Sequence, residues 1–154
     1  NIDFVLNLIG KFESVSFELK VLNFIKLNNL IDNVNLCGVK IGREKFEFFS
    51  TADIFCFPTF FESETFGIVN IEAMMFELPV ISTNWRGIPD IVEDGTTGYL
   101  CQIKNPEAIA DKIEILFRNP KLMSEMGKKG REKFLKKYTI DIFKNNIINA
   151  FDNC

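Results

Sequence analysis

The sequence predicts an α/β fold in which a Rossmann-like parallel sheet is flanked by helices. Short apolar runs alternate along the chain with longer segments whose apolar residues recur at helical spacing. Because neighbouring parallel strands are joined by crossovers that are usually helices, this alternation favours parallel strands with right-handed connections. The length of 154 residues is enough for one domain with a substantial core and leaves no room for a second.

The expected strands are apolar runs bounded by turn residues. The run at 53–57 is typical: it is largely apolar, and Pro58 ends it. In chain order the expected strands cover residues 3–9, 35–38, 53–57, 79–83 and 98–102.

The segments between these strands have helical spacing. The helix expected at 66–76 starts at Gly67 and is apolar apart from Glu72, whose charge needs a partner. Asn105 can cap a later helix, and Pro106 fits its first turn. The other expected helices cover 17–27, with an apolar face that includes Leu19, Phe24 and Leu27; 43–50, with Phe46, Phe48 and Phe49 available for the sheet; 121–138; and 139–151, with an apolar stripe of Phe143, Ile147 and Phe151.

Composition excludes several classes of function. The net charge is −3 and the basic residues are dispersed, except in a run at 128–137, so no nucleic-acid partner is expected. We interpret this run as the solvated face of an amphipathic helix, with a patch for phosphate or an anionic membrane as the alternative. With no histidine and no Cys-x-x-Cys, no metal site is expected. The unpaired spacing of Cys37, Cys56, Cys101 and Cys154 predicts reduced core thiols in a cytoplasmic protein.

One acidic segment stands out at a strand-to-helix crossover. Glu64 and Glu72 lie on either side of Gly67, directly after the expected strand at 53–57. Open α/β sheets bind ligands at the carboxyl ends of their strands, where helix N-termini present unpaired N–H groups and a positive dipole end. The position would suit a diphosphate.

The residues around this pair supply the specificity that spacing alone lacks. Four motifs follow in one order: Glu64-Thr65-Phe66-Gly67, Glu72-Ala73-Met74, Leu78-Pro79-Val80-Ile81, and the stretch from Gly87-Ile88-Pro89-Asp90 to Gly98. Together they resemble the nucleotide-binding domain of glycosyltransferase family 4, the group 1 enzymes of GT-B fold, over about Asn33 to Tyr138.

The resemblance implies a nucleoside-diphosphate sugar as the donor substrate. It places Glu64 beside the donor sugar as the catalytic carboxylate, and Glu72 suits the ribose because a carboxylate accepts hydrogen bonds from both hydroxyls of a diol. Thr65 and the backbone N–H groups that follow would meet the distal phosphate and the sugar. These N–H groups belong to Phe66, Gly67, Ile68 and Val69, and Gly67 would let the ligand approach the backbone closely.

Two further segments have expected places in the resembled enzymes. Val39 and Lys40 follow a strand where those enzymes contact the base, although Lys40 also fits a solvated loop position. Arg86 stands where the family often has glycine, and we expect it on the surface, with an anion of the donor or acceptor as the alternative partner. Residues 90–98 are rich in turn formers and are expected to shape the chain before the next strand.

The resemblance implies a retaining transfer of a hexose from a UDP- or GDP-sugar to a sugar or a lipid-linked acceptor. No cofactor is expected, and the absence of Asp-x-Asp agrees with a metal-independent mechanism. The Arg and Lys that neutralise the diphosphate in the family lie upstream of the first strand, so the fragment is expected to be inactive alone. The alternatives are a non-catalytic sugar-nucleotide or interaction module, and a GT-B-fold epimerase or phosphorylase.

The expected organisation follows from the same resemblance. Residues 1–138 would form the Rossmann-like domain, truncated at its N-terminus because the chain opens within a strand-like run and lacks an initiating Met. Residues 139–154 would form a helix that packs toward a missing N-terminal domain. That domain would hold the acceptor site and any membrane contact, which places the protein in the cytoplasm or peripherally at the inner face of the membrane. No transmembrane run or secretory signal is visible.

Overall fold

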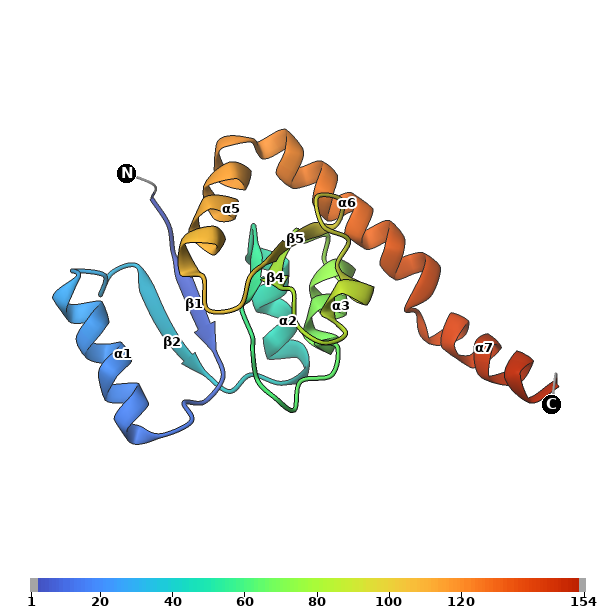
Figure 1. Ribbon diagram of the computed structural model, residues 1–154, viewed down its shortest axis with the longest axis horizontal. Coiled ribbons are helices and arrows are strands. Elements are labelled where there is room, and N and C mark those ends of the chain that lie inside the picture. The colour runs from blue at the N-terminus through green and yellow to red at the C-terminus, as the bar shows by residue number, and fades with distance from the viewer. Residues whose placement is uncertain (1–2, 153–154) are drawn as a thin grey trace. The chain divides into compact units, whose positions relative to one another are not determined.

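The computed structural model describes residues 3–152 (Figure 1). The chain divides into two compact units, with the boundary between Phe48 and Phe49. Its strands are all parallel, as predicted, and their hydrogen-bonded ladders form two sheets, β1-β2 and β3-β4-β5. No helix within residues 3–152 is long and apolar enough to cross a bilayer.

The first unit is a strand-helix-strand motif. Strand β1 (Leu6–Ile9) pairs with β2 (Val34–Gly38), and a side-chain hydrogen bond from Asn35 Nδ2 to Asn7 Oδ1 (2.9 Å) joins the two strands. Helix α1 (Val15–Leu27) connects them. It starts earlier than predicted because Ser14 caps it: the Ser14 hydroxyl accepts the Phe17 N–H at 3.2 Å. The broad apolar face expected on this helix is only partly buried, since Ile25 is buried whereas Leu19, Phe24 and Leu27 are exposed.

Helix α2 (Gly42–Thr51) runs across the boundary between the units, and its last turn belongs to the second. There Phe49 is buried, as predicted, and its ring packs against Phe55 and Phe76 with centroid separations of 5.3 and 5.7 Å. These contacts tie the end of α2 to the sheet of the second unit.

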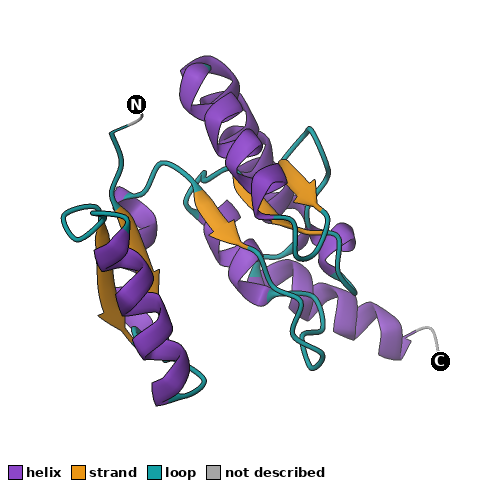
Figure 2. Cartoon of the chain, turned by 60° about the vertical axis from the view of Figure 1, so that its left-hand side comes forward, coloured by secondary structure: helices purple, strands orange, loops and turns teal. Residues whose placement is uncertain are grey.

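The second unit is built on a three-stranded sheet, drawn in orange between purple helices in Figure 2. The strands are β3 (Phe55–Phe57), β4 (Val80–Thr83) and β5 (Gly98–Cys101), with β4 in the centre and all four of its residues buried. Helix α3 (Ile68–Met75) contacts β3 and β4, and α5 (Pro106–Arg118) contacts β4 and β5. Asn105 caps α5 as predicted, since its Oδ1 accepts the Ala108 N–H at 3.0 Å.

The core of this unit lies between the sheet and helices α5 and α6 (Pro120–Lys137). Its centre is Ile81, Cys101, Leu116 and Met126. Burial raises the pKa of the Cys56 thiol to about 11 and raises that of Cys101 above its ordinary value, so both remain neutral. Cys37, Cys56 and Cys101 are free thiols, as predicted, although Cys37 and Cys56 are only half-buried; Cys154 lies outside the described residues.

Helix α6 fixes the position of α3. Gly127 and Gly130 allow the two segments to approach closely: a Cβ at Gly127 would collide with the Glu77 carbonyl, and one at Gly130 would lie 3.2 Å from Met74 Cγ. The Arg131 Nη1 donates a hydrogen bond of 2.6 Å to the Met75 carbonyl at the end of α3.

The prediction that residues 128–137 form only a solvated face is wrong at Lys133. This side chain is 8% exposed, and its ammonium lies 2.8 Å from Glu93 Oε1 and 3.2 Å from the Asp90 carbonyl. It joins α6 to the end of α4 (Ile88–Ile91), a short helix where the sequence predicted a turn. The hydrogen bond from Lys133 holds the pKa of Glu93 below its ordinary value of 4.5.

Replacing Glu93 with Gln is therefore expected to destabilise the fold in a pH-dependent way. Because the pKa of Glu93 is lowered by folding, its contribution is present above pH 4.5 and is lost as the pH falls through the lower pKa of the folded state. We expect the free energy of unfolding to fall by about 1 kcal/mol at pH 7, since Glu93 is half exposed, and by less at pH 3. Urea unfolding at both pH values measures it. Glu125→Gln, which removes an exposed ion pair with Lys121, is the matched control. An equal loss of unfolding free energy for Glu93→Gln at both pH values would contradict a stabilising role for the charge of Glu93.

The terminal helix α7 (Ile140–Asp152) follows α6 and has no buried residue. The predicted stripe is present and exposed, with Phe143, Ile147 and Phe151 at 57%, 41% and 77%. That it packs toward another domain stays a prediction.

Candidate functional site

The acidic segment forms the crossover between β3 and α3. Strand β3 ends at Phe57, and Gly67 takes a left-handed conformation (φ 65°, ψ 71°) as the N-cap of α3. The helix begins at Ile68, two residues later than predicted, because this glycine turns the chain into the helix axis.

Four hydrogen bonds hold this crossover against the end of β4 and the segment that follows it. In each, a donor between residues 82 and 87 reaches a backbone carbonyl between residues 57 and 65. The donor and carbonyl pairs are Ser82 Oγ and Phe57 (2.8 Å), Thr83 Oγ1 and Thr59, Trp85 Nε1 and Phe61 (2.9 Å), and Gly87 N and Thr65 (2.9 Å). Because Ser82 and Thr83 are themselves buried, the loop is fixed to the core of the sheet.

Glu64 contacts the start of α3. Its Oε1 accepts the N–H of Gly67 at 3.0 Å and that of Thr65 at 3.1 Å. A carboxylate is favourable here because the N-terminal end of a helix carries partial positive charge. The structure thus differs from the expectation that the Gly67 N–H faces a phosphate: in this state a protein carboxylate occupies it.

The reason for glycine at position 67 also differs from the prediction. A Cβ built there would lie 2.6 Å from Asn70 Nδ2 and 3.1 Å from the Phe57 ring, which are both inside the protein. Glycine is needed for its positive φ and for this internal contact, and its role in the close approach of a ligand stays a prediction.

The N–H groups of Ile68 and Val69 remain available at the tip of α3. Within the described residues neither donates a hydrogen bond, as is usual for the first turn of a helix, and the Ile68 side chain is 61% exposed. Glu72 stands one turn further along the same face as Ile68, partly buried and with Oε2 fully buried. Because helical side chains lean toward the N-terminus, Glu72 is directed back to the tip.

The second unit therefore brings most of the predicted site residues to one end of α3. These are Glu64, Thr65, Phe66, Gly67, Ile68, Val69 and Glu72. Val39 and Lys40 belong to the first unit, where they follow β2. Val39 is exposed, and Lys40 forms an ion pair of 3.5 Å with Glu44, which fits a surface position.

Sequence reasoning missed one residue near the tip, Asn70, and it did not predict the backbone conformation of another, Arg86. Asn70, in the first turn of α3, is fully buried, and the signal for it was available because only Asn70 and Glu72 are polar in this helix. Arg86 is an exposed residue, as predicted, but its backbone is left-handed at φ 48°, and its guanidinium lies 5.4 Å from the centroid of the Trp85 ring.

The left-handed backbone at Arg86 explains why glycine suits this position. We expect Arg86→Gly to be more stable than Arg86→Ala by about 1 kcal/mol, because both variants lose the contact with Trp85 but only Ala keeps the strain of a Cβ at positive φ. Thermal unfolding of the two variants measures the difference. Equal stability would show that this backbone conformation carries no strain.

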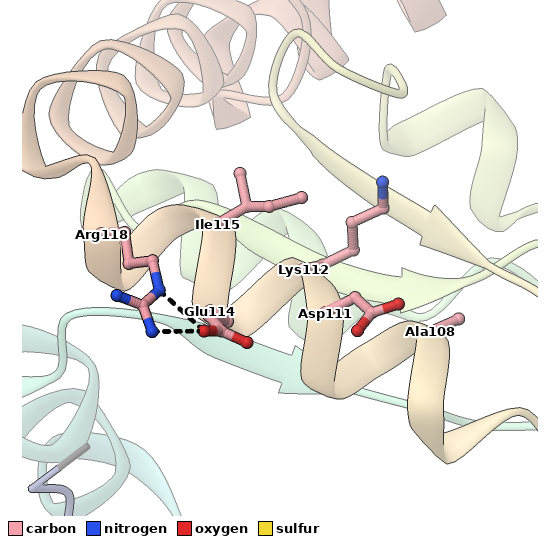
Figure 3. A pocket seen from close by; sticks show the side chains of 6 residues that line it. All are labelled: Ala108, Asp111, Lys112, Glu114, Ile115 and Arg118. Carbon is pink, nitrogen blue, oxygen red and sulfur yellow. Dashed lines mark hydrogen bonds and ion pairs between the residues drawn. The ribbon is translucent and has the colours of Figure 1, made fainter. Parts of the chain in front are cut away.

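A hollow lies along α5, and none of the predicted site residues lines it (Figure 3). One helix supplies its whole lining, in which Arg118 and Glu114 form an ion pair of 2.6 Å. Its lining residues are Ala108, Asp111, Lys112, Glu114, Ile115 and Arg118. In the part of the chain that the structure describes, His, Cys, Asp and Glu side chains do not gather into a group that could hold a metal ion.

Comparisons with known proteins give one consistent result. A family model described as "Glycosyl transferases group 1" matches residues 1–133. The capsular polysaccharide biosynthesis glycosyltransferase CapM of Staphylococcus aureus is 36% identical over 113 residues, which are 73% of this chain and 29% of CapM. The poly(ribitol-phosphate) alpha-N-acetylglucosaminyltransferase of Staphylococcus aureus (strain COL) is 31% identical over 87% of this chain and 27% of its own length.

Solved structures show the same fold. Anabaena Alr3699/HepE in complex with UDP superposes with a TM-score of 0.89 at 17% identity, over 98% of this chain and 41% of HepE. HepE has also been solved with UDP-glucose. The α/β fold predicted from the sequence is thus confirmed as that of GT-B glycosyltransferases. The chain spans only about a third of the length of the curated relatives that it matches.

Proposed function

Because the chain belongs to the group 1 glycosyl transferases, we propose that it is the donor-binding part of a retaining enzyme that transfers a hexose from a nucleoside-diphosphate sugar. The acceptor would be a sugar or a lipid-linked glycan. The observation that carries the proposal is the gathering of two acidic side chains and the open N–H groups of Ile68 and Val69 at the tip of α3. UDP and UDP-glucose bound to HepE, which has the same fold, support a nucleotide-sugar ligand.

The phosphate, the ribose and the sugar of the donor each have a chemical counterpart at this tip. The distal phosphate would accept hydrogen bonds from the N–H groups of Ile68 and Val69, where the helix dipole favours negative charge. Glu72 would accept hydrogen bonds from the ribose diol. That Val39 and Lys40, which belong to the first unit, contact the base stays a prediction from the sequence. Glu64, with Thr65 and Phe66 beside it, would face the sugar.

The chemistry needs stabilisation of charge at both ends of the breaking bond. The bond between the anomeric carbon and the phosphate oxygen breaks, the diphosphate leaves with the electron pair, and the acceptor hydroxyl forms the new bond and gives up its proton. The Glu64 carboxylate would stabilise the positive charge that develops at the anomeric carbon, and the N–H groups would stabilise the leaving diphosphate without a metal.

The 154-residue chain alone is expected to bind donor weakly and to transfer no sugar. A helix dipole contributes about 0.3 to 2 kcal/mol, whereas stabilising the leaving group takes several kcal/mol and in the resembled family depends on an upstream Arg and Lys. Cations outside this chain would therefore be required.

Nucleotide titration tests the proposal. Adding UDP, GDP and ADP separately to the ¹⁵N-labelled chain should shift the amide signals of Ile68, Val69 and Glu72 for one nucleotide more than for the others, because the phosphates are common to all three and the base is not. The amides of α5 around the hollow at Asp111 are the internal control. If none of the three nucleotides shifts the signals at the tip of α3, the proposed donor site is wrong.

A second candidate is a non-catalytic module that binds sugar nucleotides. It is favoured by the hydrogen bonds of Glu64 to Gly67 and Thr65, because a carboxylate that caps a helix has a structural role even without catalysis. The two candidates differ in whether transfer by the complete protein depends on the charge of Glu64.

A further inference from the structure

The buried amide of Asn70 is the most unusual polar group in the described residues. The side chain is 0% exposed, and neither Nδ2 nor Oδ1 has a hydrogen-bond partner there. Buried amides are nearly always paired, because leaving one without a partner costs the full desolvation penalty of the group. An amide in this state points to a partner that it gains in another state of the protein.

The position of Asn70 in α3 suggests which group that partner is. Gly67 is the N-cap, so Asn70 is the third residue of the helix, and its Nδ2 lies 2.6 Å from the place that a Gly67 Cβ would take. A polar side chain at this third position commonly reaches back to the backbone N–H of the cap residue, as in the capping box. A half-turn of the amide about its last torsion would exchange Nδ2 for the Oδ1 acceptor.

The N–H of Gly67 already has an acceptor, which is Glu64 Oε1 at 3.0 Å. The Glu64 carboxylate therefore makes the bond to this buried N–H, while the unpaired amide of Asn70 lies close to the same glycine. The function proposed above requires this same carboxylate to contact the donor sugar. If Glu64 turned away with nothing in its place, the Gly67 N–H would be left buried and unpaired.

We propose that Asn70 is a positioning residue that releases Glu64 for the donor: its side-chain oxygen takes over the Gly67 N–H when the Glu64 carboxylate turns to the sugar. This inference rests on the proposed function for the role of Glu64. This change of acceptor keeps the N-terminus of α3 capped in both states and gives the Asn70 side-chain oxygen a bond that it lacks in the first. Glu64 can then engage the donor at little cost to the helix.

This change of acceptor can be tested without any donor. The measurement is amide hydrogen exchange at Gly67 in the 154-residue chain. In Glu64→Ala, Asn70 should bond to the Gly67 N–H. We therefore expect the protection of this amide to stay within about threefold of its value in the chain without substitutions. In Glu64→Ala/Asn70→Leu we expect it to fall by about tenfold or more. Glu64→Ala/Asn70→Asp, which restores an acceptor of the same shape, should recover the protection. The Val80 amide in the central strand is the reference for global stability.

A second measurement connects the change of acceptor from Glu64 to Asn70 with donor binding. In the complete protein, Asn70→Leu should bind UDP as before but bind UDP-glucose about five- to tenfold more weakly, because only the sugar requires Glu64 to leave the helix. The same variant should unfold at an unchanged or higher urea concentration, since the amide that it removes has no bond in the unliganded state. Asn70→Ser, which is smaller and keeps a hydroxyl, serves if the Leu variant does not fold.

The possible outcomes separate this inference from the proposed function. If Glu64→Ala alone exposes the Gly67 amide as much as the double variant with Leu does, Asn70 does not take over the bond and the inference is overturned. The inference is also overturned if protection behaves as expected but Asn70→Leu binds UDP-glucose normally. If the protein without substitutions binds neither UDP nor UDP-glucose, the proposed function is wrong, whatever amide hydrogen exchange shows.

Discussion

Glu64→Gln in the complete protein is expected to lower kcat/KM for sugar transfer by about 100- to 1,000-fold, the range seen when one group that stabilises a transition-state charge is removed. Glutamine keeps an oxygen that can accept the N–H groups of Gly67 and Thr65, so the cap of α3 survives. What it lacks is the negative charge that would stabilise the anomeric carbon as the diphosphate leaves. Steady-state kinetics, together with a urea unfolding curve that should not move by more than about 1 kcal/mol, separate the two roles.

Glu62→Gln is the matched control for this experiment. Glu62 is an exposed residue of the same loop, two positions away, and carries the same charge. It should leave kcat/KM within about twofold, because an exposed charge in water contributes little. Normal transfer by Glu64→Gln would remove the catalytic role and leave the non-catalytic module as the function.

Gly127→Ala is expected to destabilise the fold by about 3 kcal/mol. In a solvated helix the same change would stabilise by about 1 kcal/mol, because alanine is the better helix former. Here the added methyl group would collide with the backbone carbonyl of Glu77, which cannot move without shifting the turn that leads from α3 into β4. Urea unfolding measures the loss, and weaker UDP binding should accompany it because α3 carries the proposed site.

The matched control is Gly130→Ala, one turn further along the same helix. There the nearest atom is Met74 Cγ at 3.2 Å, on a flexible side chain that can adjust. We expect a change within about 1 kcal/mol, since the gain in helix propensity offsets the tighter contact. Similar losses for both variants would show that general crowding of α6, and not the Glu77 carbonyl, limits the packing.

Local signals made much of the fold predictable. The Asn105-Pro106 start of α5 was found from two adjacent residues, and the cap bond to Ala108 confirms it. Features that depend on distant residues were not predictable in the same way. The division of the parallel strands between two sheets depends on pairing across the chain, and the buried Lys133 depends on a partner 40 residues away in sequence, Glu93. Helix α4 was missed because the short Ile88–Ile91 segment, with Pro89 in it, has the composition of a turn.

The candidate site shows the same limit. The motif placed Glu64, Gly67 and Glu72 on a loop and the helix that follows it because all three lie within a few residues of one another. It did not predict that Glu64 bonds to the tip of that helix, since the same residues would also allow the carboxylate to face solvent. Asn70 was overlooked among apolar neighbours, and only its burial in the structure distinguishes it from a surface amide.

The way in which the loop after β3 is tethered bears on how this protein can be re-engineered. All four tethers end on main-chain oxygens, and the hydrogen bonds of the loop's own side chains come from Thr59 and Glu64. Positions 60–63 all project into solvent and are therefore suitable for a randomised library. Selection could alter substrate preference there while the donors at Ser82, Thr83, Trp85 and Gly87 preserve the scaffold.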